Sequence, residues 1–204
     1  MAQRGRPRDA EADERILRVA LGQLMEYGYA GFVVDKVAEQ AGVAKTTLYR
    51  RWPTKDHLAV AVIARMQDDV AVPDTGNVRA DLIDYVQQIA LGLNRMRRAG
   101  RQHEADDLSA GVVAELVAAA ARHPDTGVLV HAVFARRNEL VLRLIDRARQ
   151  RGALHPATDP GLLFDQLAGA LYYRLLITGQ PIDRSYAERL VNAALNGVLP
   201  LRES

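Results

Sequence analysis

The 204-residue sequence predicts an all-α protein in which a three-helix unit containing a helix-turn-helix precedes a larger group of helices. In nearly every segment apolar residues recur at intervals of three and four, the period of an amphipathic helix. No segment shows enough two-residue alternation to predict a strand. Glycine and proline separate the helical segments, most clearly at Gly28, Gly42, Pro124 and Gly152.

The composition is that of an ordinary globular protein and excludes several classes of site. The chain contains no cysteine, so it has no disulfide, no thiolate zinc site and no cysteine nucleophile. No apolar run approaches the ~18 residues of a membrane span. Arg4, Arg6 and Arg8 are not followed by the apolar stretch of a secretory signal. We therefore expect a cytoplasmic protein with no membrane partner.

Positive charge is concentrated near the amino terminus. Residues 1–55 contain ten Lys/Arg against seven Asp/Glu, whereas residues 56–204 contain seventeen against eighteen. The densest groups of cations lie in residues 4–8 and in residues 45–55. This distribution indicates that the amino-terminal quarter faces phosphates; an ordinary solvated charged surface is the alternative.

The first predicted helix runs from about Asp9 to Tyr27, and Gly28 ends it. Its apolar stripe is expected to pack against the helix-turn-helix, and we assign it no chemistry. The arm before it, Arg4-Gly5-Arg6-Pro7-Arg8, resists helix formation. We expect Arg4 and Arg6 to lie in a DNA minor groove, where narrow A·T-rich stretches attract arginine. A terminal tail without a role is the alternative.

The helix-turn-helix is predicted over Val34–Leu58. A first short helix carries small Ala38 and Ala41 on one side, and Gly42 supplies the left-handed conformation of a sharp turn. The second helix, Ala44 to Arg50, is too short and polar to bury much. In this arrangement the second helix enters the DNA major groove. A helix hairpin with a solvated basic end is the alternative.

Side-chain chemistry divides this unit into base contacts and backbone contacts. Lys45, Thr46 and Thr47 begin the second helix, where lysine can donate to guanine and threonine can contact thymine. Side chains suited to phosphates, which fix register without specifying sequence, follow them: Tyr49, Arg50, Arg51 and Lys55. Thr54 is expected to cap the next helix and to help bind a phosphate. Two residues of this segment are expected in the core: Leu48 and Trp52.

The segment GYAGFVVDKVAEQAGVAKTTLYRRWPTKDHL resembles the DNA-binding domain of the TetR (tetracycline repressor) family of transcriptional regulators. The shared positions are Gly28-Tyr29, Val37-Ala38, Ala41-Gly42-Val43, Leu48-Tyr49, Trp52, Lys55 and Leu58. The resemblance implies an arm and DNA-binding domain over residues 1–57 and a helical ligand-binding and dimerisation domain over residues 58–204. It also implies DNA-backbone contacts for Tyr49 and Lys55.

Two positions depart from the family pattern, and each lacks a hydroxyl. Val33 stands before the first short helix, where the family usually has threonine, and Ala44 stands where it often has serine. An alanine N-cap costs about 1 kcal/mol relative to serine or threonine. We therefore expect DNA affinity to depend more on Arg50, Arg51, Lys55 and the amino-terminal arm.

The remaining sequence predicts further helices. One continues to Val70 before residues 72–76 break it, and a charged loop follows the next helix at residues 97–107. The predicted helices after that break are Val78–Met96, Leu108–Arg122, Asp125–Gln150 and two within Asp159–Leu199.

By resemblance to the family, the middle helices are expected to form the pocket of an unknown small-molecule effector. Asn138 is expected on the apolar face of the long helix, where its amide needs a partner or a ligand. A mostly apolar ligand is predicted, and plain core is the alternative for any one residue. The candidate ligand-binding residues are Met66, Tyr85, Ile89, Met96, Phe134, Asn138 and Leu142.

The last two predicted helices carry more apolar surface than one small domain is expected to cover. Two copies packing as a four-helix bundle would bury it, and LYYRLLITGQPID resembles the dimerisation region of one TetR subgroup. Burial within one subunit is the alternative. The candidate dimer-interface residues are Leu163, Leu167, Leu171, Leu175, Leu190 and Ala194.

These observations predict a homodimeric repressor of a palindromic operator that a small ligand releases. A ligand-independent DNA-binding regulator, controlled by its abundance or by a protein partner, is the alternative. An enzyme is not expected, and neither is a metal or cofactor. The acidic group His103–Asp107 lies in a predicted loop, and His123, His131 and His155 lack the spacing of metal ligands.

Overall fold

The computed structural model describes residues 10–68, 71–99 and 111–196, and these residues form nine helices and no strand. The all-α prediction is confirmed. The helices are α1 (Ala10–Tyr27), α2 (Val34–Gln40), α3 (Lys45–Arg51), α4 (Lys55–Asp68), α5 (Val78–Arg98), α6 (Gly111–Arg122), α7 (Pro124–Gln150), α8 (Pro160–Leu176) and α9 (Arg184–Asn196).

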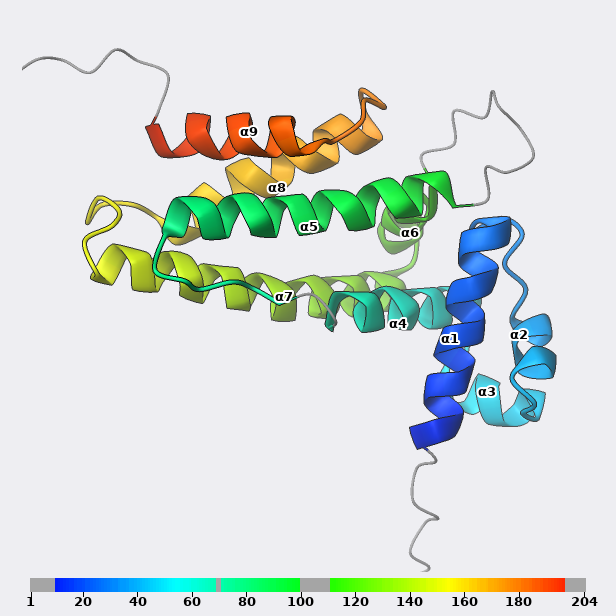
Figure 1. Ribbon diagram of the computed structural model, residues 1–204. Coiled ribbons are helices and arrows are strands. Elements are labelled where there is room, and N and C mark those ends of the chain that lie inside the picture. The colour runs from blue at the N-terminus through cyan, green and yellow to red at the C-terminus, as the bar shows by residue number, and fades with distance from the viewer. Residues whose placement is uncertain (1–9, 69–70, 100–110, 197–204) are drawn as a thin grey trace, which may run out of the picture.

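Figure 1 shows two parts joined by α4. Helices α1–α3, which we call the head, lie at one end of the molecule, and α5–α9, which we call the body, extend away from them. Helix α4 packs against α1 of the head and against α6 and α7 of the body. Among the described residues, no helix is both long and apolar enough to cross a bilayer.

The head is held in shape by two left-handed glycines and a small core. Gly28 and Gly42 have φ angles of 65° and 66°, which an L side chain adopts only under strain. Ala38 of α2 and Leu48 of α3 are buried in the hydrophobic core, and α2 packs against both α1 and α3. The predicted glycine turn between α2 and α3 is therefore confirmed.

Neither short helix of the head has a side-chain N-cap, as expected from Val33 and Ala44. Buried Gln23 of α1 supports α2 instead: its Oε1 accepts from the Val33 amide at 3.4 Å, and its Nε2 donates to Gln40 Oε1 at 3.2 Å. One glutamine thus braces both ends of α2, and the sequence pattern gave no sign of it.

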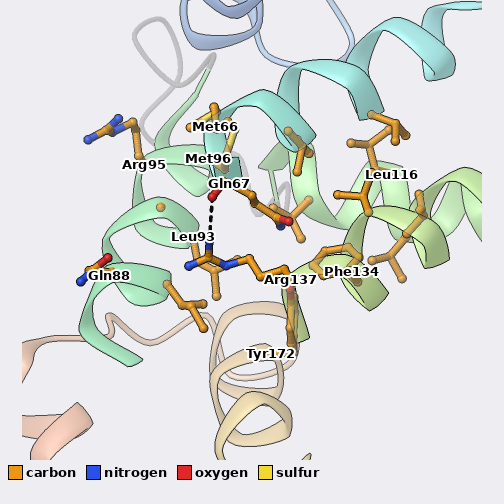
Figure 2. Close-up of a pocket in the computed structure, with 18 of the residues that line it drawn as sticks. Met66, Gln67, Gln88, Leu93, Arg95, Met96, Leu116, Phe134, Arg137 and Tyr172 are labelled. Atoms are coloured by element: carbon orange, nitrogen blue, oxygen red, sulfur yellow. Dashed lines mark hydrogen bonds between the residues drawn. The ribbon is translucent and has the colours of Figure 1, made fainter. Parts of the chain in front are cut away.

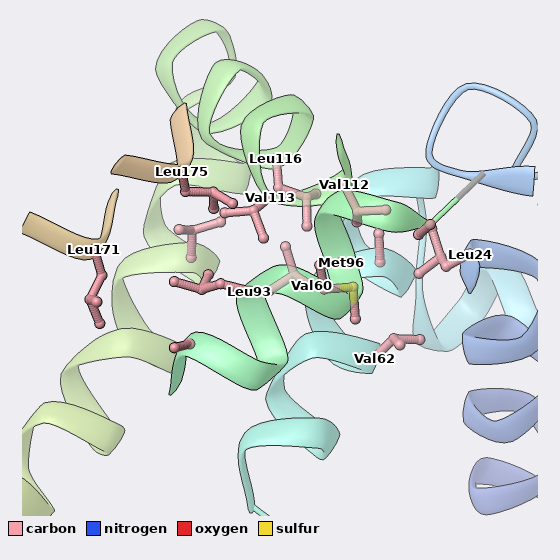
Figure 3. Packing of buried hydrophobic residues seen from close by; sticks show 14 of the residues in the cluster. Leu24, Val60, Val62, Leu93, Met96, Val112, Val113, Leu116, Leu171 and Leu175 are labelled. Carbon is pink, nitrogen blue, oxygen red and sulfur yellow. The ribbon is translucent and has the colours of Figure 1, made fainter. Parts of the chain in front are cut away.

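The head and the body share one hydrophobic core. Figure 3 shows Leu24 of α1 lying close to Val62 of α4, with Met96 and Val112 of the body beside them. All four side chains are buried. Helix α4 is therefore packed along its length and is not a free linker between the two parts.

The predicted dimer residues are placed differently from our expectation. Four of them face the core of their own subunit: Leu163, Leu167, Leu171 and Leu175. Leu190 and Ala194 are half-buried and pack against that core. Helix α8 is apolar on most of its circumference, so its periodicity could not show which face turns inward. Its exposed face carries Leu162, Gln166, Gly169 and Tyr173, and the two large residues are 59% and 60% exposed.

Candidate nucleic-acid interface and ligand cavity

Helix α3 presents a row of exposed polar side chains. Leu48 is fully buried and half-buried Trp52 packs beside it, and together they fix the inner face of the helix. Thr47, next to Leu48 in the sequence, is half-buried. On α3, the predicted DNA-contacting residues that are exposed are Lys45, Thr46, Tyr49 and Arg50.

Asp35 of α2 holds two of these side chains. Lys45 Nζ lies 2.6 Å from Asp35 Oδ2, and the Tyr49 hydroxyl donates to Asp35 Oδ1 at 2.9 Å. The hydrogen bonds from Lys45 and Tyr49 lower the pKa of Asp35 below its ordinary value. The carboxylate is therefore charged at neutral pH, and sequence analysis missed its role.

Two predicted phosphate-binding residues are already engaged within the head. Arg51 pairs with Asp13 of α1. Lys55 is half-buried: its Nζ donates to the Ala30 carbonyl at 3.3 Å and lies 4.4 Å from the centre of the Tyr29 ring. Burial lowers the pKa of Lys55. These contacts with the fold were not expected from the sequence.

Thr54 caps α4 in the way that the sequence predicts. The His57 amide donates to Thr54 Oγ1 at 3.3 Å, and His57 Nδ1 lies 2.7 Å from the same oxygen. Thr54 is exposed. Arg4 and Arg6 lie outside the described residues.

Asp56, in the first turn of α4, joins the head to the body. The Tyr29 hydroxyl donates to Asp56 Oδ1, and Thr126 Oγ1 of α7 donates to Asp56 Oδ2 at 3.3 Å. Thr126 is buried. Burial and the bond to Asp56 raise the pKa of Tyr29, so its hydroxyl stays protonated. One carboxylate therefore links the loop after α1 to the start of α7.

A cavity of about 300 Å³ lies in the body and is lined by α4, α5, α6, α7 and α8. Figure 2 shows the side chains that surround it, with Met66 and Gln67 of α4 on one side and Tyr172 of α8 on another. Its lining is mostly apolar. A cavity of this size is at the lower end of the range for small-molecule sites.

Four of the predicted ligand-binding residues line this cavity: Met66, Ile89, Met96 and Phe134. The other three do not. Tyr85 is fully buried against Phe164, with ring centres 6.2 Å apart. Leu142 packs against the core, and Asn138 is half-buried outside the cavity. The neighbouring residue Arg137 lines the cavity in place of Asn138. One step along a helix rotates the side-chain direction by about 100°, so the two residues face different ways.

Arg137, the neighbour of Asn138, lines the cavity and is buried, with only 8% of the residue exposed. Its Nη1 donates to the backbone carbonyl of Gln67 at 2.7 Å, as Figure 2 shows. Its guanidinium carbon lies 5.0 Å from the centre of the Tyr85 ring. An arginine within a helical pattern usually marks the solvated face, so sequence analysis did not select it.

Tyr172 supplies a second polar group to the cavity. Its ring meets Phe134 edge-on, with centres 6.2 Å apart. Burial raises the pKa of Tyr172 to about 12, although Arg137 acts in the opposite direction. The phenol is therefore protonated at neutral pH and can donate a hydrogen bond.

The described residues contain no cluster of side chains that could hold a metal ion. His123, His131 and His155 are exposed and separate in the sequence. The acidic group His103–Asp107 lies outside the described residues.

Comparison with known families covers both parts of the chain. Residues 16–62 match the family described as bacterial regulatory proteins, tetR family. Residues 72–194 match the family described as tetracyclin repressor-like, C-terminal domain. The second match spans more than half of the chain.

The chain belongs to the TetR family.

TetR-family relatives match along almost the whole chain. The HTH-type transcriptional regulator YdeS of Bacillus subtilis is 31% identical, over 97% of this chain and 94% of the relative. The DNA-binding transcriptional repressor TetR of Mycobacteroides abscessus is 32% identical, over 96% and 95%. This chain is accordingly a DNA-binding transcriptional regulator and not an enzyme.

Solved structures of transcriptional regulators share the fold. The TetR family transcription regulator SCO0332 is 34% identical and superposes with a TM-score of 0.78, covering 93% of this chain and all of that one. FadR from Bacillus subtilis, in complex with stearoyl-CoA, has a TM-score of 0.61 at 14% identity, covering 92% of this chain and all of that one. The latter likeness shows the fold alone.

Proposed function

We propose that this TetR-family chain acts in the cytoplasm as a homodimeric repressor of a two-fold symmetric operator and leaves the DNA when a small molecule fills its cavity. The observation that carries this proposal is the position of α4. Helix α4 begins four residues after α3 ends, packs against α1, and lines the cavity through Met66 and Gln67. Occupancy of the cavity therefore acts on a helix packed against the head.

The α3 surface supports the DNA-binding part of the proposal. Lys45 and Thr46 lie at the start of α3, where side chains of a recognition helix reach base edges. Arg50 is exposed on the same helix and suits a phosphate. We propose that Thr47, Tyr49, Arg51, Thr54 and Lys55 add contacts at the margins, the last four after small rearrangements of the contacts they make within the protein.

The exposed face of α8 supports the dimer. Leu162, Gln166, Gly169 and Tyr173 form one stripe, and large apolar side chains in such a stripe favour burial against a second copy. Gly169 has no other atom within 4 Å of an added Cβ, so a partner helix can approach closely there. A dimer would place its two α3 helices on half-sites about 34 Å apart, or a multiple of that distance.

The test is operator retardation with purified protein, using a palindrome from beside its own gene. Arg50→Ala should weaken operator and unrelated duplexes about equally and lower the salt slope by about one. Lys45→Ala should cost about 1–3 kcal/mol on the operator only, which relaxes sequence preference. Equal losses from both variants would refute this division of roles.

The ligand part of the proposal has its own test. Compounds that raise the melting temperature of the protein should release the operator at matching concentrations, because ligand binding and DNA binding oppose each other reciprocally. FadR from Bacillus subtilis, which shares this fold, was solved with stearoyl-CoA. Operator binding that no cavity ligand disturbs would instead favour control by abundance or by a protein partner.

A further inference from the structure

The cavity is lined by two uncharged polar groups that make no hydrogen bond within the described part of the chain. The side-chain oxygen of Gln67, Oε1, is buried and has no hydrogen-bond partner among the described residues. Tyr172 lines the same cavity, and its hydroxyl forms no hydrogen bond to a described residue. Keeping a polar group out of water without a partner costs free energy, so each such group calls for an explanation.

The two groups have opposite hydrogen-bonding roles and come from different helices. Burial raises the pKa of Tyr172 to about 12, so its hydroxyl is protonated at neutral pH and can donate. Gln67 Oε1 can only accept. Figure 2 shows Gln67 at the end of α4 on one side of the cavity and Tyr172 of α8 on another. A ligand that carries both an acceptor and a donor would therefore satisfy both groups.

The side chain of Gln67 is independent of the contact that its backbone makes with α7. The Gln67 carbonyl accepts from Arg137 Nη1 at 2.7 Å, and this bond does not involve the side-chain amide. A substitution of the Gln67 side chain therefore leaves the acceptor of Arg137 in place. The two functions of this residue can be tested separately.

The rest of the lining favours an apolar skeleton for the ligand. Most of the lining side chains are apolar, among them Ile63, Met96 and Phe134. Two further apolar lining residues are exposed, Leu91 of α5 at 56% and Val117 of α6 at 43%. Because α5 packs against α6, these residues mark an apolar opening of the cavity between the two helices.

We propose that the cavity takes a mostly apolar molecule with a hydrogen-bond donor at one end, for Gln67 Oε1, and an acceptor at the other, for the Tyr172 hydroxyl. A hydroxy ketone is a simple member of this class. This inference rests on the proposed function, because it names the class of effector for the same cavity. Such a ligand bridges α4 and α8, and its bond to Gln67 acts on the last turn of the helix that leads to the head.

The test uses probes that share a diphenyl skeleton and differ only in these polar groups. Para- and meta-hydroxybenzophenone carry a hydroxyl and a carbonyl at two spacings. Benzophenone carries the carbonyl alone, para-benzylphenol the hydroxyl alone, and diphenylmethane neither. Equilibrium dialysis measures their binding to the full-length protein. The tighter hydroxybenzophenone should bind about threefold to tenfold more tightly than either probe with one polar group, and diphenylmethane should bind most weakly.

Two variants assign the two preferences to their side chains. In Gln67→Met, hydroxybenzophenone should bind no more tightly than benzophenone, but should keep its advantage over para-benzylphenol. Tyr172→Phe should show the converse, so each variant is a control for the other. Gln88→Met is the matched control for Gln67→Met, because Gln88 lines the same cavity and no buried atom of its side chain lacks a partner among the described residues. This control should match the wild type for every probe.

The stability of the ligand-free variants gives an independent readout. Replacing an unpartnered polar group by an apolar one of similar shape is neutral or stabilising. Gln67→Met and Tyr172→Phe should therefore melt at or above the temperature of the wild type, although they bind hydroxybenzophenone less tightly. A lower melting temperature in either variant, or a failure to fold, would show that the group already serves the free protein and would overturn the proposal.

The binding data can contradict the proposal in two further ways. Equal binding of all probes, or binding of none, would overturn it, because a ligand would then gain nothing from the two groups. A preference for the hydroxyl that survives in Gln67→Met would also overturn it.

A parallel operator-release assay separates this inference from the proposed function. Probes that bind with the expected preferences without releasing the operator would support the ligand class and contradict ligand-controlled repression. Release by diphenylmethane as effective as release by hydroxybenzophenone would support ligand-controlled repression and overturn the ligand class.

Discussion

Asp35 binds both Lys45 and Tyr49 on the surface that faces DNA in the proposed complex, so a phosphate must displace a carboxylate before either side chain can contact the duplex. On random DNA this exchange gains little, because one anion replaces another. On the operator, hydrogen bonds to base edges can compensate for the lost contacts with Asp35. Asp35 therefore favours sequence-specific over non-specific binding.

Replacing Asp35 with Asn should tighten binding to unrelated DNA several-fold and reduce the ratio of operator to unrelated affinity. The amide keeps the shape of the side chain but loses the charge that holds Lys45. Titration of both duplexes by fluorescence anisotropy measures the ratio. Glu39→Gln is the control, because it removes an exposed carboxylate of α2 that raises the pKa of Lys45 less than Asp35 does and is not the hydrogen-bond partner of Lys45. If both variants changed the affinity ratio equally, the loss of one negative charge alone would explain the effect and Asp35 would have no specific role.

At the scale of a helix, the N-cap position of α3 is Ala44, which provides no side-chain cap. Ala44→Ser should add one, since the serine hydroxyl can accept from the amides of the first turn, and should raise the free energy of unfolding by about 1 kcal/mol. Urea unfolding measures the change. Ala135→Ser makes the same substitution on the exposed face inside α7, where it should be neutral or slightly destabilising. Equal effects would exclude capping as the cause.

Asp56 of α4 couples the loop after α1 to α7, because it accepts a hydrogen bond from each of them. Tyr29→Phe and Thr126→Val each remove one hydroxyl donor to Asp56 and should each cost about 0.5–1.5 kcal/mol. The loss of unfolding free energy in the double variant should differ from the sum of the two single losses, because both donors share one carboxylate. Both single variants should also shift the ligand concentration that releases the operator. Strict additivity in unfolding and unchanged release would show that the two bonds act independently.

The elements show what periodicity could and could not predict. All nine helices found in the described part of the chain were expected, because breakers such as Gly28, Gly42 and Pro124 separate clear apolar stripes. The inward faces of α7 and α8 were harder to predict from periodicity. Helix α8 is apolar nearly all round, and α7 buries Arg137 through a contact with the last turn of α4, which lies 70 positions earlier. A contact of that sequence separation leaves no local pattern.

The candidate site divides in the same way. The exposed positions of α3 were predictable from residue type and from the helix-turn-helix spacing. The partners of Lys45, Arg51 and Lys55 were not predictable, because Asp35, Asp13 and Ala30 come close to them only when the head folds together with the start of α4. The family resemblance implied a ligand pocket in the middle helices, and the cavity residues Met66, Met96 and Phe134 were expected from their side chains and positions on those helices. The two arginines of the lining, Arg95 and Arg137, were not expected.

At the scale of the whole molecule, the exposed face of α8 defines the assembly that we propose. Gly169→Glu should halve the mass in solution, because the added charge lies in the stripe of Leu162 and Tyr173, and the open space at Gly169 leaves the subunit intact. Analytical ultracentrifugation measures the mass. Gly22→Glu, at another open helical glycine but in α1, should stay dimeric. A Gly169→Glu dimer as stable as the wild type would place the interface elsewhere.

Helix α4 has one further consequence, since its first turn carries Asp56 and its last turn carries Gln67. Fourteen residues make a rod about 21 Å long, which tilts far more easily than it stretches. A displacement of about 1 Å at the Gln67 end then corresponds to a tilt of about 3° for a rod of that length. In the dimer that we propose, two heads that tilt in mirrored directions would double any such misalignment. A stiff α4 carries a displacement from the cavity to the head whatever side chains line the cavity. The residues of the cavity wall can therefore differ without any change in how α4 couples the cavity to the head.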